Sequence, residues 1–377
     1  MILIGNSLEK LKEIESESID CCVTSPPYWG LRDYGLPGSL WGGDNACNHK
    51  WLPNVVLRQR SGRNDTSDST WHRPSRDANP KDIESAFCKK CNGWFGCLGL
   101  EPTPLMFVEN LNMIFQEVKR VLKPEGTCWM NLGDTYIGGG RGAGGNSLDT
   151  ERHEKGTAWG KPNKPTGNLK QKDLIGIPWR CALRLQDDGW YIRSDIIWYK
   201  HNPMPESVTD RPSKTHEYIF LLTKSSKYYY NAKAIAEPQK DISLKRYYAN
   251  NHMENRKDKE NSQYAISSER QDDYFASERE KIERGEILTR NKRSVWEINT
   301  ASVREAHFAT YPEELPATCI KAGCPEGGTV LDPFFGSGTT GKVAENLGRK
   351  WIGIEMNPEY AEIAKKRTSQ LSLLVDR

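Results

Sequence analysis

The sequence predicts an α/β protein in which a mostly parallel sheet carries helices on both faces and is interrupted by insertions. Near the C-terminus, a short apolar strand, a glycine-rich loop, an amphipathic helix and a second strand follow one another between residues 329 and 355, which is the order of a βαβ unit. Near the N-terminus, the apolar run 19–24 predicts a buried strand. It ends at Pro26-Pro27, because proline has no N–H to donate to a neighbouring strand.

The alternation of helices and strands continues between these two regions. Apolar residues at helical spacing predict a helix over 105–123, then a turn at 124–126 and a strand at 127–132. The same reasoning predicts the remaining elements: a helix at 178–187, a turn at Asp188-Gly189, strands at 190–199 and 217–223, a strand at Thr329–Asp332, a glycine loop at 334–338, a helix at 339–347, a strand at Lys350–Glu355 and a helix at 358–371.

Length and charge limit the functions to consider. The chain has 377 residues and a formal net charge of +3, so it can form one large domain with insertions or two domains. Nucleic-acid binding stays open, because a local basic face is sufficient for it. The N-terminus does not read as a secretory signal, and no apolar stretch approaches the roughly 20 residues of a membrane span. We therefore expect a cytoplasmic protein without a membrane partner.

Three segments depart from the regular pattern. Residues 42–100 are polar and contain clustered Cys and His, and we interpret them as an insertion. Residues 138–172 are rich in Gly, Lys and Asn, which is typical of a long mobile loop. Residues 236–293 carry dense charges of both signs and could be partly helical.

The insertion contains residues with the chemistry of a metal site. Cys47 and His49 form one pair, and Cys88-Lys89-Lys90-Cys91 adds two sulfurs in the spacing of a metal knuckle. Cysteines of an intracellular protein are expected to be reduced thiols or metal ligands. We therefore predict a structural Zn²⁺ held by Cys47, His49, Cys88 and Cys91. Free thiols in a polar insertion are the alternative, and His72 and Cys97 are the substitutes if one ligand is misassigned.

The C-terminal glycine loop has the features of a ligand-binding turn. It reads Asp332-Pro333-Phe334-Phe335-Gly336-Ser337-Gly338-Thr339-Thr340, between a predicted strand and a predicted helix, where glycines let a ligand approach the backbone. Glu355 ends the next strand, where an acidic side chain can bind ribose hydroxyls. A glycine loop alone is equally typical of a tight turn, but the longer motif with its distant acid is more specific.

The second motif is Thr24-Ser25-Pro26-Pro27-Tyr28, directly after the first predicted buried strand. Taken with the glycine loop, it resembles the signature of the amino-methylating DNA methyltransferases. The motif order, target motif first and cofactor motif last, is similar to that of the β group of this family. The resemblance extends to Leu132-Gly133-Asp134, to the strand 194–198 and to the segment Arg211–Glu217.

This resemblance implies a Rossmann-like methyltransferase fold with a circularly permuted motif order, and it implies S-adenosylmethionine as cofactor. In the family the glycine loop holds the methionine end of the cofactor, and the later acid holds its ribose. The stretch His307–Pro312 looks like the segment that completes the methionine pocket. Where family members carry Gly-Asp near the N-terminus, this chain has Gly5-Asn6. The residues expected to contact the cofactor are Asn6, Thr24, Phe308, Ala309, Thr310, Asp332, Phe334, Gly336, Ser337, Gly338, Thr339, Thr340, Glu355 and Met356.

The chemistry of amine methylation explains the target motif. An exocyclic amine of cytosine or adenine is a poor nucleophile, because its lone pair is delocalised into the ring. The Ser25 hydroxyl and the Pro26 carbonyl can accept its hydrogens, and Tyr28 offers a face for a flipped base. We therefore take Ser25, Pro26 and Tyr28 as the catalytic residues, acting by positioning and electrostatics without a covalent intermediate. A proline-stiffened turn is the structural alternative.

The resemblance leaves several activities open. A leading serine is associated in this family with cytosine N4, which is the expected target, and adenine N6 is the first alternative. Methylation of RNA or of another amine is a weaker one. Methylation at cytosine C5 would need a nucleophilic cysteine, usually in a Pro-Cys pair, and the sequence contains none. A zinc-stabilised DNA-binding protein without catalysis belongs to a different class, against which the intact Ser25, Tyr28, Asp332 and Glu355 argue.

The expected organisation follows from the motifs. Residues 1–41 and 101–230 would form the target-base half, residues 42–100 the zinc-binding insertion, residues 231–300 the target-recognition region and residues 301–377 the cofactor half. Double-stranded DNA is the expected partner, and an arginine-rich part of the insertion is suited to contact it. A homodimer and a separate restriction endonuclease partner are compatible with the sequence, and the host would be a bacterium, an archaeon or a phage.

Overall fold

The computed structural model describes residues 1–30, 36–52, 55–57, 83–137, 168–203, 205–239, 281, 284, 287–300 and 311–375. Contacts divide the chain into two compact units. The larger unit is formed by Met1–Tyr230 together with Ser294–Arg377, and the smaller one by Asn231–Arg293. The described part of the smaller unit contains a short 3-10 helix, Ala232–Ile235, and an antiparallel pair of two-residue strands, β10 (Glu237–Pro238) and β11 (Thr289–Arg290).

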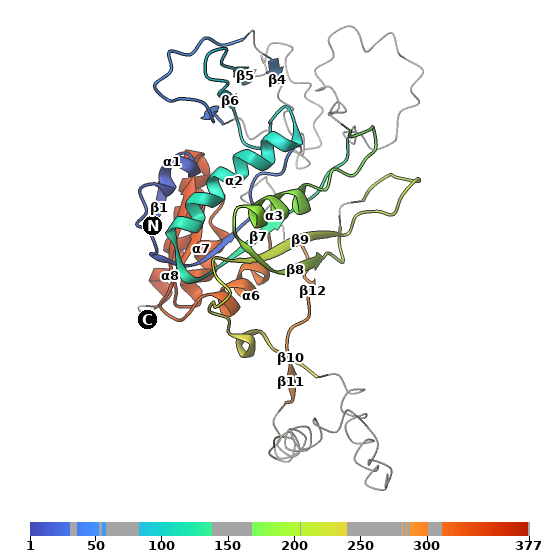
Figure 1. Ribbon diagram of the computed structural model, residues 1–377. Helices are drawn as coiled ribbons and strands as arrows, with labels where there is room; N and C mark the ends of the chain where they lie inside the picture. The colour runs from blue at the N-terminus through green and yellow to red at the C-terminus, as the bar shows by residue number, and fades with distance from the viewer. Residues whose placement is uncertain are drawn as a thin grey trace, which may run out of the picture. The chain divides into compact units, whose positions relative to one another are not determined.

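An eight-stranded mixed sheet forms the centre of the larger unit (Figure 1). Five neighbouring strands run parallel, in the order β1-β14-β13-β2-β7, and β9 then pairs antiparallel with β7 and with β8, while β12 pairs parallel with β8. The bounds of these strands are β1 Ile2–Ile4, β2 Ile19–Thr24, β7 Leu122–Leu132, β8 Tyr191–Tyr199, β9 His216–Thr223, β12 Val295–Glu297, β13 Thr329–Asp332 and β14 Lys350–Glu355.

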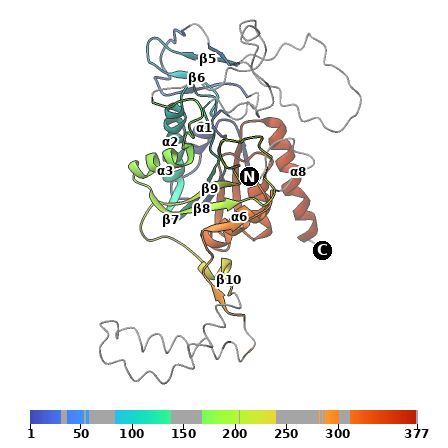
Figure 2. The same ribbon diagram turned by 90° about the vertical axis from the view of Figure 1, so that its right-hand side faces the viewer.

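Helices cover both faces of this sheet. Figure 2 shows α2 and α3 on one side and α8 on the other. Helices α1 and α3 pack against α2, and α6 and α8 pack against α7. The core lies between sheet and helices, with the side chains of Phe107, Phe115 and Phe220 fully buried. The helix bounds are α1 Ser7–Leu11, α2 Pro104–Val121, α3 Ile177–Asp187, α6 Glu314–Gly323, α7 Thr339–Asn346 and α8 Pro358–Val375.

The predicted α/β architecture is confirmed, and the strands predicted at 19–24, 329–332 and 350–355 match β2, β13 and β14 residue for residue. The turn predicted at 124–126 is wrong as a break between elements. Strand β7 begins at Leu122 and runs through it, and its pairing with β2 jumps from Ile19–Leu122 to Cys21–Thr127. The intervening residues bulge out of the ladder, which is how a strand accommodates a proline.

For the insertion 42–100 the sequence predicts a polar, zinc-binding segment and no strands, but its described part forms a small antiparallel sheet together with Ser39–Trp41. Its order is β3-β6-β5-β4, with bounds Ser39–Trp41, Trp94–Gly96, Ile83–Phe87 and Val55–Leu57. Most of the predicted loop 138–172, the region 240–280 and the arginines of the insertion lie outside the described residues. Among the described helices, none has the length and apolar character that crossing a membrane requires.

A buried carboxyl group joins the small sheet to the main core. Glu101 is 4 % exposed, and its oxygens accept hydrogen bonds from the Gly99 amide at 2.9 Å and from Asn110 Nδ2 at 3.0 Å. Burial raises the pKa of Glu101 from its ordinary value of 4.5 to about 7, although the hydrogen bonds oppose the shift. Between these two pH values the unfolded chain loses the proton while the folded chain keeps it. Stability from this group is therefore complete below pH 4.5 and is lost as the pH rises through 7.

Replacing Glu101 by Gln should remove this pH dependence. A shift of this size corresponds to about 3 kcal/mol, so E101Q should be more stable than the wild type at pH 8 by up to about that amount and close to it at pH 5. Urea unfolding at both pH values measures the difference. E109Q, which removes a half-exposed carboxylate paired with Arg184, is the control and should follow the wild-type pH profile. Parallel pH profiles for E101Q and the wild type would contradict the assignment.

Candidate active site

The sequence motifs meet at one edge of the sheet because of strand direction. Strands β1, β14, β13, β2 and β7 are parallel, so their carboxyl ends lie at the same edge, where α/β proteins bind ligands. Glu355, Asp332 and Thr24 end three of these strands. Strand β9 runs the other way, so its first residues, including Glu217, reach the same edge.

A buried hydrogen bond connects the two motifs. Thr24 and Asp332 are 1 % and 2 % exposed, and Thr24 Oγ1 donates to Asp332 Oδ1 at 2.7 Å. Asp332 also accepts from the Phe334 amide at 3.0 Å, from Thr340 Oγ1 and from the Tyr311 hydroxyl. Burial raises the pKa of Asp332, and these donors hold it down by favouring the carboxylate. The residue before Ser25 is therefore fixed to the first residue of the glycine loop.

The glycine loop adopts the backbone that its sequence predicts. Gly336 and Gly338 have φ of +52° and +81°, a region that other residues rarely adopt. The Gly336 amide donates to Glu355 Oε2 at 2.7 Å, and Glu355 Oε1 accepts from the Asn357 amide at 2.7 Å. Glu355 is 9 % exposed, and burial raises its pKa. The loop is thus tied to the end of the next strand.

The other predicted cofactor residues differ in their surroundings. Arg367 Nη1 donates to the carbonyl and hydroxyl oxygens of Ser337 at 2.8 and 2.7 Å and lies 3.3 Å from Thr339 Oγ1. Phe334 and Met356 are half-buried beside the loop. Phe308, Ala309 and Thr310 lie outside the described residues, and Tyr311, which follows them, contacts Asp332 and Thr340.

Asn6 has a local structural role that the sequence did not reveal. Its Oδ1 accepts from the Leu8 amide at 2.8 Å and caps the N-terminus of α1. Its Nδ2 donates to Ser39 Oγ at 2.7 Å, at the start of β3. The residue thereby links the edge of the main sheet to the small sheet of the insertion.

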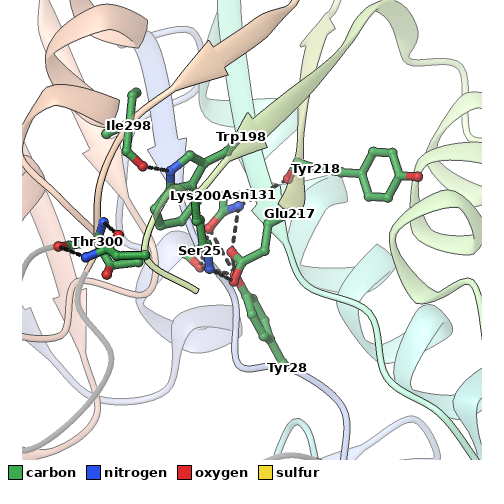
Figure 3. A network of polar contacts seen from close by, with 10 residues as sticks. Ser25, Tyr28, Asn131, Trp198, Lys200, Glu217, Tyr218, Ile298 and Thr300 are labelled. Carbon is green, nitrogen blue, oxygen red and sulfur yellow. Dashed lines mark hydrogen bonds and ion pairs between the residues drawn. The ribbon is translucent and has the colours of Figure 1, made fainter. Parts of the chain in front are cut away.

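A polar network surrounds the target motif (Figure 3). Asn131 Nδ2 donates to the Tyr218 carbonyl at 3.1 Å. A carbonyl can only accept, so this bond turns Asn131 Oδ1 toward the motif, where it accepts from Ser25 Oγ at 3.2 Å. The Tyr28 hydroxyl lies 2.6 Å from Glu217 Oε2 and 3.0 Å from Asn131 Oδ1. The Tyr28 hydroxyl donates its one hydrogen bond to the Glu217 carboxylate, which is the nearer acceptor and is charged.

Glu217 is held by a cation from the neighbouring strand. Lys200 Nζ forms an ion pair with Glu217 Oε1 and lies 4.2 Å from the centre of the Trp198 ring. Trp198 Nε1 in turn donates to the Ile298 carbonyl at 2.8 Å (Figure 3). Both ends of the ion pair are largely buried, with 17 % and 16 % of the side chains exposed. Lys200 and Glu217 are thus fixed beside Tyr28.

Ser25 and Tyr28 are predicted from the sequence, whereas Asn131, Lys200 and Glu217 are not predicted as site residues. Asn131 directly precedes Leu132-Gly133-Asp134, and Glu217 ends the segment Arg211–Glu217, so both lie at stretches that resembled the family. No spacing rule connects these residues to Ser25. The pairing of β7 with β2 and β9, and of β9 with β8, brings them together.

The predicted metal ligands also come together. Cys47, His49, Cys88 and Cys91 place their ligand atoms within 4.8 Å of one another. Cys97 does not belong to this cluster, since its Sγ donates to the Leu36 carbonyl at 3.0 Å. His72 lies outside the described residues.

Comparison with known proteins assigns the chain to a family. A model of N6/N4 methyltransferases, described as DNA methylase, matches residues 19–366, which include both motifs. The chain belongs to this family of DNA methylases. The methylase is 37 % identical over 367 residues to the type II methyltransferase M.SmaI of Serratia marcescens, covering 97 % of this chain and 89 % of the relative. It is also 37 % identical over 363 residues to M.Cfr9I of Citrobacter freundii, covering 96 % and 85 %.

A solved structure supports the fold of the methylase. The PvuII DNA methyltransferase, described as cytosine-N4-specific, aligns with a TM-score of 0.52 at 16 % identity, covering 97 % of this chain and 85 % of that one. At this identity the likeness shows a shared methyltransferase fold, as the motif order implied.

The position of the Tyr28 ring depends on Gly133. A Cβ placed on Gly133 would lie 2.5 Å from Tyr28 Cε2, too close for the ring to stay where it is. G133A should displace the ring from Glu217 and lower the methyl-transfer rate about tenfold or more, since small misplacements are costly in catalysis. In a Y28A background the same change should add little, because the clash is gone. A rate assay on the four proteins measures this, and additive losses would contradict it.

Proposed function

We propose that this methylase transfers a methyl group from S-adenosylmethionine to N4 of a flipped cytosine in double-stranded DNA. The observation that carries the proposal is the convergence of the Ser25 and Tyr28 hydroxyls with Asn131, next to a residue that is hydrogen-bonded to Asp332. This arrangement puts acceptors for an amine beside a loop suited to a nucleoside cofactor.

The glycine loop fits the cofactor chemically. A Cβ added at Gly336 would meet nothing within 4 Å, so this side of the loop is open to a ligand. Glu355 uses one lone pair of each oxygen for a backbone amide and retains others for ribose hydroxyls. The carboxylate oxygens of Asp332 already accept hydrogen bonds from protein groups, so we propose that Asp332 maintains the conformation of the loop. The further proposed contacts are Asn6, Thr24, Phe308, Ala309, Thr310, Phe334, Ser337, Gly338, Thr339, Thr340 and Met356.

The network around Ser25 prepares an acceptor. S-adenosylmethionine, when bound, supplies an electrophilic methyl group on a sulfonium. Ser25 donates its only proton to Asn131 Oδ1, so the free lone pairs of Ser25 Oγ can accept a hydrogen from the substrate amine. The Pro26 carbonyl accepts the second hydrogen. With both hydrogens engaged, the amine nitrogen can become pyramidal, and its lone pair would be available to form the N–C bond. The C–S bond would break with its electron pair going to sulfur, and the surplus amine proton would be released to solvent.

Tyr28 provides the surface for the base. Its hydroxyl is fixed by Glu217, and Glu217 is fixed by Lys200, so the ring keeps one orientation. A rigid aromatic face favours a base that has left the DNA stack. We assign Lys200, Glu217 and Asn131 as positioning residues, which act through Ser25 and Tyr28.

The choice of cytosine rests on the leading serine of the motif, and adenine N6 is the competing target. Nucleosides from DNA treated with the purified methylase and S-adenosylmethionine separate the two possibilities. We expect N4-methylcytosine by mass spectrometry. N6-methyladenine without N4-methylcytosine would overturn the assignment, and an absence of S-adenosylmethionine binding by calorimetry would favour a DNA-binding protein without catalysis.

Removal of the Ser25 hydroxyl should strongly reduce turnover. S25A is expected to lower kcat by about 10²-fold or more, as with the loss of other electrostatic contacts to a reacting group. Cofactor affinity should change little, because Ser25 contacts Asn131 and not the glycine loop. Single-turnover methylation measures the rate, and calorimetry measures the cofactor affinity. S7A is the serine control in the calorimetry, because the Ser7 hydroxyl donates to the carbonyl of Pro333 in the glycine loop. A near-normal rate for S25A would refute the role of Ser25.

Neutralising Glu217 should separate positioning from binding. E217Q retains a hydrogen-bond acceptor for Tyr28 but removes the ion pair with Lys200, so kcat should fall about tenfold with little change in the KM for cofactor. In a K200M background the loss should be smaller, because the ion pair is already absent. Steady-state kinetics on the four proteins test this. Equal losses of kcat in both backgrounds would show that Lys200 does not act through Glu217.

The domain roles expected from the sequence complete the proposal. Residues 231–300 are proposed to recognise the target sequence, and residues 42–100 to contact DNA beside it. The relatives are named type II methyltransferases, which supports a modification role in restriction–modification together with a separate endonuclease. Analytical ultracentrifugation would show whether the methylase forms a homodimer.

A further inference from the structure

The four residues of the insertion have the spacing of a tetrahedral zinc site. Cys47 Sγ and Cys88 Sγ are 3.9 Å apart, and Cys91 Sγ and His49 Nδ1 are 3.5 Å apart. Zinc bonds of about 2.3 Å to sulfur and about 2.0 Å to nitrogen give tetrahedral edges of about 3.8 and about 3.5 Å. Two edges of the cluster therefore already have the length that one Zn²⁺ requires, and all four ligand atoms lie within 4.8 Å of one another.

The backbone around Cys88 is folded as a metal knuckle. The Cys88 amide donates to the Gly93 carbonyl at 2.8 Å, and the Asn92 amide donates to the Cys88 carbonyl at 3.0 Å. Asn92 has a φ of +57°, which lets the chain reverse within this short turn. The Lys90 amide points at Cys88 Sγ from 3.4 Å, as an N–H does when it stabilises a thiolate. The turn thus brings the sulfurs of Cys88 and Cys91 within 4.8 Å of each other.

His49 is held by its neighbours in an orientation suited to the same centre. Its ring stacks on Trp51, with centroids 4.6 Å apart, and Trp51 pairs with Cys88 through an antiparallel bridge. The Lys89 amide donates to the Lys50 carbonyl at 2.8 Å, which ties the two halves of the cluster together. Residues more than 35 positions apart in the sequence are therefore aligned by backbone pairing before any metal is considered.

The small sheet would gain stability from such a cross-link. Its strands are three to five residues long, and sheets of this size bury little apolar area of their own, although Trp41 and Trp94 pack into the main core. A closed site with four protein ligands leaves no position for substrate, so a metal here would stabilise structure and take no part in methyl transfer.

The sheet also supports the chain that leaves the target motif. The Gly30 amide donates to the Gly99 carbonyl at 2.8 Å, and Trp29 Nε1 donates to the Glu101 carbonyl at 3.0 Å. Trp41 Nε1 donates to the Gly96 carbonyl at 2.9 Å. The segment that follows β6 thus connects the small sheet to the residues directly after Tyr28.

We propose that Cys47, His49, Cys88 and Cys91 bind one structural Zn²⁺, and that the metal-bound sheet holds the residues after Tyr28 in place. The site lies outside the methyl-transfer chemistry and does not depend on which base is methylated.

Metal content tests the first part. Full-length protein carrying a tag without histidines, after dialysis against metal-free buffer, should contain about one zinc per chain by plasma mass spectrometry. C88S and C91S should each retain less than a tenth of that amount, whereas C97S, a cysteine of the same insertion outside the cluster, should retain all of it. Folded wild-type protein with less than a tenth of an equivalent, or equal loss in C97S, would overturn the site.

Cobalt replacement keeps the proposal testable if the cysteine variants do not fold. Wild-type protein with zinc exchanged for Co²⁺ should show the intense visible bands of tetrahedral Co²⁺ and a thiolate charge-transfer band. Bound cobalt without these bands would show an adventitious surface site and overturn the proposal.

Hydrogen exchange tests the second part without relying on activity. Chelation of the metal should accelerate amide exchange in peptides covering 25–30 and 96–101 by about tenfold or more, because the Gly30–Gly99 bond opens locally. Peptides covering the glycine loop 332–340 should exchange as before. Unchanged exchange at 25–30 after removal of the metal would refute the link to Tyr28.

Discussion

The hydrogen bond between Thr24 and Asp332 is the contact on which the arrangement of the site depends. It joins residues 308 positions apart, and it exists because β2 and β13 are parallel neighbours in the centre of the sheet. A buried carboxylate without donors would be costly, so Asp332 requires the hydroxyls and amide that surround it. These donors come from the target motif, the glycine loop and the segment before α6. The proposed base site and the proposed cofactor site therefore share this hydrogen bond, and a shift of one would disturb the other.

Around the target motif, hydrogen-bond donors and acceptors follow one another in a defined order. The Tyr218 carbonyl orients Asn131. Asn131 Oδ1 accepts a hydrogen bond from Ser25, and Glu217 accepts one from Tyr28. A serine hydroxyl in water can donate as readily as accept. The groups near Ser25 Oγ, Asn131 Oδ1 at 3.2 Å and the Tyr28 hydroxyl at 3.5 Å, favour donation by Ser25 and leave its lone pairs for an incoming donor.

The sequence predicted the fold and the two motifs because both depend on local chemistry. Short apolar runs located β2, β13 and β14, apolar residues at helical spacing located the main helices, and glycine and proline marked the turns. The sequence did not predict the roles of Asn131, Lys200 and Glu217. These residues meet through antiparallel pairing between β7, β9 and β8, which no local pattern encodes. The turn at 124–126 was misjudged for a related reason: a proline can be held as a bulge when strong pairing continues beyond it. Asn6 was assigned to the cofactor, but its capping of α1 could only be seen in three dimensions.

The reversed direction of β9 has a consequence for how such methylases can diversify. Strand β8 ends at Tyr199 and β9 begins at His216, so the connection between them leaves and re-enters the sheet at the active edge. The connection contains the ion pair of Arg211 with Glu206, and its Asp210 pairs with Lys172. Loop closure depends only weakly on length, so residues can be gained or lost between Lys200 and Glu206 at little thermodynamic cost while Lys200 and Glu217 stay in place. The approach to the proposed base site can therefore change in evolution without altering Lys200 and Glu217.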